Sequence, residues 1–385
     1  MKWSYENICS LWDFRREDNK ERKKKGRILK LLAFATGGIT ALIWANNQKS
    51  SFSQYIIMCI TIITFVFIHV IIHETGHLIG GLISGYRLIS FRIFLLTFIK
   101  TSDHNKIKLQ KLKGTGGQCL MLPPKGIELT KCPYYLYTMG GILFDMFVTI
   151  LVFFSAIWLC DTPAMRNILL IYVVFGIYLA IENYFTFPKY ILTNDGTNMR
   201  SIRQNELLRW SFMQQLIIYQ SLCAGKDFQE FTEEEIELPK GSDITEPINS
   251  LFLNIQYMKY LKIRDFNNAE KILFNLESEY ESMSRRMQLM IDVERLFLLL
   301  IQDADIRVIK THYKNIKKDM KKNKSLASVL RTLYAYERII HKENNKVIPI
   351  INRIKVMLHI TPIKQEVQLN IELMEWLEEH IISME

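Results

Sequence analysis

The stretch FIHVIIHETGHLIGGLISGY, residues 67–86, carries polar chemistry inside an otherwise apolar segment. Its apolar run is interrupted by His69, His73, Glu74 and His77. Burying an ionised carboxylate or an unpaired imidazole among apolar side chains is costly, and such residues are rare inside membrane-spanning segments for that reason. Some partner has to compensate for these groups, and a bound metal ion would neutralise the site.

The spacing of two of these histidines is that of a metal-binding helix. His73 and His77 stand four residues apart, so on a helix both side chains share one face and reach one ion. Glu74 lies beside them, where it reaches a water molecule on that ion. The motif is HExxH, the signature of zinc hydrolases, and two imidazoles leave room for a third protein ligand and one open position. The alternative is a chance HExxH on an ordinary helix.

Four apolar stretches are long enough to cross a bilayer, for which a helix needs about 20 residues. They lie at 28–46, 53–80, 135–160 and 166–187. Lys and Arg residues concentrate before the first stretch, between the second and third, and after the fourth. The positive-inside rule then places both termini and the long loop in the cytosol. The sequence therefore predicts an α-helical, multi-pass protein of the cell membrane.

The formal net charge of +10 does not by itself indicate a nucleic-acid partner. The basic clusters at 19–30 and 100–114 flank apolar stretches, so we interpret them as topology signals and expect no nucleic acid. The 6 cysteines show no CxxC spacing, which favours free thiols over disulfides. Because the first apolar run follows a long charged segment, we expect residues 1–27 to be a basic cytosolic lead rather than a signal peptide.

Asp195 is the candidate for the third metal ligand. It lies in FPKYILTNDGTNMR, residues 187–200, just past the inner end of the fourth apolar stretch. The second and fourth stretches both run from the outside to the inside, so Asp195 and the HExxH motif fall at a similar depth near the cytosolic face. The alternative is that Asn-Asp-Gly forms only a turn, since all three residues favour turns.

Three elements make the chain resemble the site-2 protease family of intramembrane zinc metalloproteases. HETGH (73–77) matches the motif of the family's first core span. MGGILFD (139–145) resembles the Gly-Pro-x-x-Asn-like element of the next span, with Ile and Asp where Pro and Asn are usual. ENYFTFPKYILTNDG (182–196) resembles the third element, Asn-x-x-Pro followed by Asp-Gly, with a looser Asn-to-Pro spacing. The resemblance covers roughly residues 53–200.

The resemblance assigns roles to the candidate site residues. It implies that His73, His77 and Asp195 are the zinc ligands and that Glu74 is the catalytic general base. Asn183 would hydrogen-bond the substrate carbonyl or the developing oxyanion, or would only pack between helices.

Two further polar residues keep open roles. Asp145 either partners a zinc-bound histidine or pairs within the helix bundle. His69 lies one turn before His73; it is either a bundle histidine or an additional ligand.

The loop at 86–133 predicts a small β element between the second and third stretches. RLISFRIFLLTFIK and KIKLQKLKGTGGQCLML read as strands, with Gly and Pro breaks between them. Related proteases carry a membrane-associated β element here, and a strand edge can capture an extended substrate segment. Gly117 is the candidate substrate-binding residue of this element. An ordinary cytosolic hairpin is the alternative.

The C-terminal half predicts soluble helical structure. Residues 201–247 read as an amphipathic helix at 206–223, near the membrane surface, and then an acidic linker. Residues 248–385 show a helical pattern with few Gly or Pro, and YMKYLKIRDFNNAEKILFNLE resembles a tetratricopeptide helix pair. We predict a cytosolic helical-repeat domain that is either structural or binds a peptide, a substrate or a regulator.

These features together predict an intramembrane zinc metalloendopeptidase with its core in residues 28–200. Its substrate would be a membrane protein or a precursor peptide. The alternative is a catalytically inactive membrane scaffold that presents the helical domain to partners, although the intact HExxH argues against it. A transporter would need polar residues through several spans, and most of these are absent.

Overall fold

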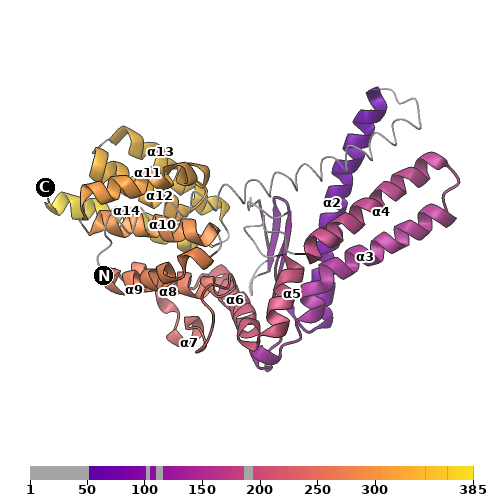
Figure 1. Cartoon of the computed structure of the whole chain (residues 1–385), viewed down its shortest axis with the longest axis horizontal. Coiled ribbons are helices and arrows are strands. Elements are labelled where there is room, and N and C mark those ends of the chain that lie inside the picture. Colours follow the sequence, from indigo (N-terminus) through magenta and orange to yellow (C-terminus); the bar gives the residue numbers. More distant parts are fainter. Residues whose placement is uncertain are drawn as a thin grey trace.

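The structure, a computed structural model, consists mostly of helices with one small sheet (Figure 1). It describes residues 52–100, 105–109, 116–185, 194–283, 285–302, 304–342, 344–361 and 363–384. The basic lead at 1–27 and the first predicted stretch at 28–46 lie outside the described residues.

Three helices are long and apolar enough to cross a membrane, which indicates that the protein is membrane-associated. They are α2 (Phe52–Ile83), α3 (Tyr135–Trp158) and α4 (Pro163–Tyr184). They coincide with the second, third and fourth apolar stretches of the sequence. Their outer surfaces expose many large apolar side chains, such as Ile60 on α2, Phe147 on α3 and Val174 on α4. Such a surface suits lipid rather than water.

Glycines bring α2 and α3 into close contact. A Cβ atom on Gly76 would collide with the backbone carbonyl of Gly140, and one on Gly80 with the carbonyl of Leu136. Small residues at a helix crossing let the two backbones approach closely. This contact sets the part of α2 that carries HETGH directly against α3.

The small β element predicted between the second and third stretches is confirmed. Its strands are β1 (Arg87–Ile93), β2 (Leu96–Lys100), β3 (Asn105–Leu109) and β4 (Gly117–Leu122). They form an antiparallel sheet of 4 strands in the order β3-β2-β1-β4. The hydroxyl of Tyr137 on α3 donates to the carbonyl of Cys119 on β4 over 2.9 Å, so the sheet is tied to the membrane helices at β4.

Two helices lead from the membrane helices to the C-terminal half: α5 (Asp195–Gln204) and α6 (Glu206–Ala224). The amphipathic helix predicted at 206–223 is present as α6, but protein covers its apolar residues. Phe212 and Met213 join a buried cluster with residues of the sheet and α3. Ile218 and Leu222, farther along α6, belong to the core of the C-terminal half. One helix is therefore shared by two cores.

The C-terminal half is all-helical among its described residues. Its main helices are α8 (Ser250–Lys262), α9 (Phe266–Ser278), α10 (Arg285–Ile301), α11 (Ile306–Lys322), α12 (Ala327–Tyr336), α13 (Asn344–Ile360) and α14 (Lys364–Met384). Short helical segments accompany them and the sheet: η1 (Leu129–Lys131), η2 (Phe228–Glu230), α7 (Glu233–Ile236), η3 (Tyr280–Ser282) and η4 (Glu337–His341). A regular tetratricopeptide-like repeat stays a prediction.

The segment 224–247, which we expected to be a linker, is packed against the C-terminal helices. Phe228, Phe231 and Ile236 are buried in the same core as Phe252 of α8. The Lys226 ammonium group also pairs with Glu235 over 2.6 Å. The acidic residues of this stretch hid the apolar side chains that hold it in place, and the C-terminal unit begins before residue 248.

Candidate metal centre

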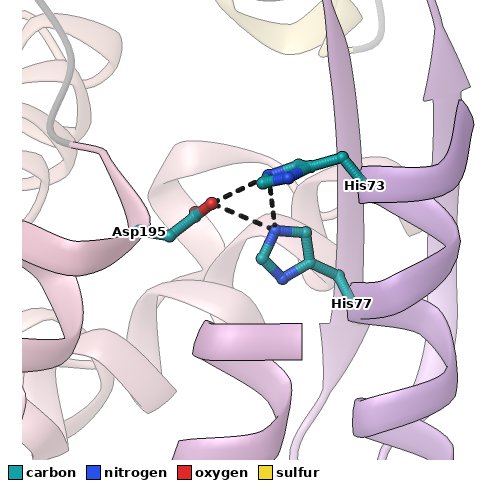
Figure 2. Close-up of side chains that lie close together, drawn as sticks. All are labelled: His73, His77 and Asp195. Atoms are coloured by element: carbon teal, nitrogen blue, oxygen red, sulfur yellow. Dashed lines mark hydrogen bonds and ion pairs between the residues drawn. The ribbon is translucent and has the colours of Figure 1, made fainter. Parts of the chain in front are cut away.

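Three side chains from distant parts of the chain converge at one point (Figure 2). His73 and His77 project from one face of α2, and Asp195 is the first residue of α5. The Asp195 Oδ2 atom lies 2.9 Å from His73 Nε2 and 3.3 Å from His77 Nε2. The two Nε2 atoms are 3.2 Å apart. Among the described residues, this is the group of His, Cys, Asp or Glu side chains whose geometry could hold a metal ion.

The other nitrogen of each imidazole ring is already engaged by an acceptor. His73 Nδ1 lies 2.8 Å from a carboxylate oxygen of Asp145 on α3. His77 Nδ1 lies 2.7 Å from the backbone carbonyl of Tyr137, also on α3. A carbonyl and a carboxylate can only accept, so both Nδ1 atoms carry a proton, and in the neutral rings both Nε2 atoms present a lone pair to the cluster. Such outer partners are the usual way a protein orients metal-binding histidines.

With both rings neutral, the cluster is a set of electron-rich atoms that need a cation between them, either a shared proton or a metal ion. Two unprotonated nitrogens and a carboxylate oxygen repel one another at 2.9–3.3 Å. A cation at their centre removes that repulsion, and the partly buried site excludes much of the water that would otherwise compensate for it. The donor set thus fits a bound metal ion.

The start of α5 is held so that Asp195 faces the histidines. The side chain of Asn194 caps the helix by accepting from the backbone N–H of Thr197 over 3.0 Å. Its amide group donates to the carbonyl of Glu182, at the end of α4, over 3.0 Å. A Cβ atom on Gly196 would collide with the backbone of Tyr184, so the glycine permits this close contact. The Asn-Asp-Gly sequence is a helix start packed on α4 rather than an isolated turn.

Electrostatics keep Asp195 ionised, as a metal ligand must be. Burial alone would raise the pKa of its carboxyl group, but in the absence of a metal ion the positive charge and hydrogen bonds of protonated His77 and His73 outweigh this and lower the pKa below its usual value. At neutral pH the side chain therefore brings a negative charge to the cluster.

Glu74 lies next to the cluster without joining it. Its side chain is 7% exposed and packs against the backbone of Gly117 at the start of β4, where even a Cβ atom would collide with it. It interacts electrostatically with His77, His73 and Arg92. The structure thus brings the predicted base Glu74 and the predicted substrate-binding residue Gly117 together. It does not bring Asn183, the other predicted substrate-binding residue, to them. Asn183 lies in the last turn of α4, and no hydrogen bond joins its side chain to the described residues of the cluster.

Asp145 and His69, whose roles the sequence left open, form a second layer behind His73. Asp145 is 1% exposed; one oxygen contacts His73 and the other lies 3.4 Å from His69 Nδ1. His69 also stacks on the ring of Tyr172 at 4.3 Å between centroids. His69 therefore contacts the outer partner, whereas the metal-ligand geometry is made by His73, His77 and Asp195.

Three residues of this region were missed as parts of the site. Arg92 on β1 was interpreted only as a topology signal, yet it is 1% exposed and donates to the carbonyl of Gly117 over 3.0 Å. Burial lowers its pKa, while the neighbouring Glu74 opposes that effect. An arginine inside the apolar strand SFRIF was the available signal. Asn194 had a capping signal, whereas Tyr137 contributes a backbone carbonyl, which leaves no trace in the sequence.

Comparison with family models, with curated proteins and with solved structures finds no match to this chain.

Proposed function

We propose that this protein is an intramembrane zinc metalloendopeptidase of the site-2 protease type. The observation that carries the proposal is the convergence of His73 Nε2, His77 Nε2 and Asp195 Oδ2, with Glu74 beside them. Zinc ligands at about 2.0–2.1 Å in tetrahedral geometry are separated from one another by about 3.3 Å. The separations of 2.9–3.3 Å are close to that value. A zinc ion held by these three atoms would keep one position open for water or substrate.

The expected roles follow from this arrangement. Zinc held by His73, His77 and Asp195 would supply Lewis-acid polarisation and easier ionisation of water. Glu74 accepts a proton from the attacking water as the water oxygen bonds to the peptide carbonyl carbon, and then delivers that proton to the amine as the C–N bond breaks. Asp145 and the Tyr137 carbonyl keep both imidazoles in the tautomer that presents Nε2 to the site.

The sheet lies beside the proposed site and offers a strand next to which a substrate could bind. Gly117 at the start of β4 touches the Glu74 side chain, and Arg92 holds the Gly117 carbonyl from the neighbouring strand. A membrane-embedded helix hides its peptide bonds, so a substrate must be extended before water can attack it. We propose that the extended segment of a membrane protein or precursor peptide lies beside this end of β4.

The proposal includes the placement of the chain. We propose a multi-pass protein of the cell membrane, with both termini in the cytosol and a cytosolic helical-repeat domain that meets a substrate or regulator. The support is the alternation of basic loops along the sequence together with three helices that can span a membrane.

Zinc content and peptide hydrolysis, measured on the same purified variants, test the proposal. We expect about one zinc per wild-type chain and slow hydrolysis of β-casein, used as an unfolded probe. Glu74→Gln should keep the zinc and lose hydrolysis, because Gln preserves the size of Glu but cannot accept the proton. His77→Ala and Asp195→Asn should lose zinc, since each removes one of only three protein ligands.

Asp161→Asn is the matched control, because Asp161 is exposed in the connection between α3 and α4. It should keep both zinc and hydrolysis. A wild-type protein that binds zinc but cleaves neither β-casein nor a membrane-anchored peptide would favour the scaffold alternative. Full zinc and full activity in Asp195→Asn would remove Asp195 from the ligand set.

A further inference from the structure

One face of α11 is uniformly basic. Its exposed lysines are Lys310, Lys314, Lys317, Lys318, Lys321 and Lys322. Their spacing of three or four residues places them on one side of the helix. The opposite side is buried through Ile309, Ile316 and Met320. The single acidic residue of this helix, Asp319, forms an ion pair with Arg285 over 2.7 Å. A single acidic residue therefore accompanies six lysines on α11.

Helix α13 lies beside the end of α11, since Arg353 donates to the carbonyl of Lys324 over 3.0 Å, and it exposes apolar side chains. Ile348, Val356 and Ile360 are large aliphatic residues that are 56%, 57% and 48% exposed. Exposed Arg353 and Lys355 lie on the same helix. Aliphatic side chains flanked by basic ones are typical of helices that lie at a membrane interface. We call the lysine stripe of α11 and the exposed side of α13 the α11–α13 face.

The position of this face relative to the membrane helices favours a lipid surface as its binding partner. In Figure 1, α11 and α13 lie on the upper side of the C-terminal unit, the direction in which α2, α3 and α4 also extend. The unit is firmly joined to these helices: Trp210 of α6 packs on Phe252 of α8 at 5.5 Å between ring centroids. Gln365 of α14 donates to the carbonyl of Leu222 on α6 over 3.0 Å. The C-terminal unit is therefore held close to any bilayer that α2–α4 cross.

We propose that the α11–α13 face docks on the anionic lipid surface of the membrane that α2–α4 cross. Lysine ammonium groups would meet lipid phosphates, and the aliphatic residues of α13 would enter the headgroup region. Each basic residue close to an anionic leaflet favours docking by about fivefold. The exposed aliphatic residues favour lipid over nucleic acid, which would use the charge alone. The proposal does not depend on the peptidase activity.

Acetylation of individual lysines, quantified by mass spectrometry, tests this in the full-length protein. The protein is reconstituted in nanodiscs of phosphatidylcholine alone or of phosphatidylcholine with phosphatidylglycerol, and treated briefly with an acetylating reagent. We expect the α11 lysines to react several-fold more slowly in the anionic nanodiscs, and the protection to fade as salt is raised. Lys240 and Lys271, exposed elsewhere on the unit, should react equally in both.

A triple variant, Lys314→Gln, Lys318→Gln and Lys321→Gln, should weaken docking roughly a hundredfold, because it removes three positive charges. Lys310 and Lys317 should then react as fast in anionic as in neutral nanodiscs. The control variant Lys240→Gln with Lys271→Gln should leave their protection intact. Unchanged slow reactivity of Lys259 and Lys262, which are mostly buried and held in ion pairs, shows that the triple variant is folded.

Equal acetylation of the wild-type stripe in both nanodiscs would overturn the proposal. So would protection in neutral nanodiscs that appears only when duplex DNA or an acidic peptide is added, which would assign the face to that partner instead.

Discussion

The carboxylate of Asp145 on α3 accepts the Nδ1–H of His73 on α2 over 2.8 Å, across 72 positions of sequence. This hydrogen bond fixes which imidazole nitrogen faces His77 and Asp195 in the candidate metal site. It also places the negative charge of Asp145 one hydrogen bond away from the candidate ligands. This charge would make the Nε2 atom of His73 more basic and so a stronger metal ligand. The same carboxylate reaches His69, so it joins two histidines of one helix.

Asp145→Asn should weaken zinc binding by about 10–100-fold, the range typical of lost outer-layer partners. The amide can still accept a hydrogen bond, but it carries no charge. Competition with a chelator of known affinity measures the change. His69→Gln, which alters a side chain on the far oxygen of Asp145, should cause a much smaller loss. Equal zinc affinity in Asp145→Asn and wild type would show that the contact is only part of helix packing.

Two glycine substitutions should separate metal binding from proton transfer. A Cβ atom at Gly141 would lie 2.6 Å from the Nε2 atoms of both His73 and His77. Gly141→Ala should therefore lower the zinc content. Gly117→Ala would press on Glu74 instead, so it should keep the zinc and lower β-casein hydrolysis. If both variants lose zinc to the same extent, Glu74 is not positioned separately from the ligands.

Reporter fusions at Asp161 and at Pro239 should report opposite sides of the membrane. Asp161 lies between α3 and α4, and a single candidate span, α4, separates it from Pro239. An activity-based pair of reporters, one active outside and one active in the cytosol, gives the measurement. We expect Pro239 in the cytosol, because the segment after α4 is rich in basic residues. The same side at both positions would contradict α4 as a span.

The C-terminal unit should be sensitive to a buried ion pair. Arg331 and Glu294 are both fully buried and pair with each other, and Tyr257 donates to the same carboxylate over 2.9 Å. Arg331→Met leaves Glu294 charged and buried, so the free energy of unfolding should fall by about 3–5 kcal/mol. Urea titration of the full-length protein in detergent, followed by brief proteolysis, measures it. Arg307→Met is the control: its ion pair with Asp305 is exposed, and stability should not change.

Sequence patterns were sufficient to predict those features of the structure that depend on residues close together in the chain. The three described apolar stretches became helices because apolar length alone indicates a spanning helix. His73 and His77 share a face because helical geometry requires it at this spacing. Asp195 was found by a depth argument that needed only the order of the spans, and the structure brings it to the two histidines.

Contacts between distant segments were beyond what the patterns contain. The pairing of Asp145 with His73 depends on the rotation of α3 about its axis, which apolar content does not determine. Burial of Phe228 and Phe231 depends on the core they enter, whereas the acidic residues around them suggested a linker. Arg92 was interpreted as a topology signal because the sequence does not show which residues surround it. Its burial depends on the pairing of β1 with β4.

The sharing of α6 between two cores has a thermodynamic consequence. Its first half lies with the sheet and α3, its second half with the C-terminal unit, and Arg209 on it donates to the carbonyl of Ile202 on α5, the helix that begins with Asp195. Any ligand of the C-terminal unit that prefers one position of α6 would thereby change the affinity with which the histidine–aspartate cluster could bind a metal ion. Linkage requires the reverse as well: the metal would change the affinity for that ligand by the same factor.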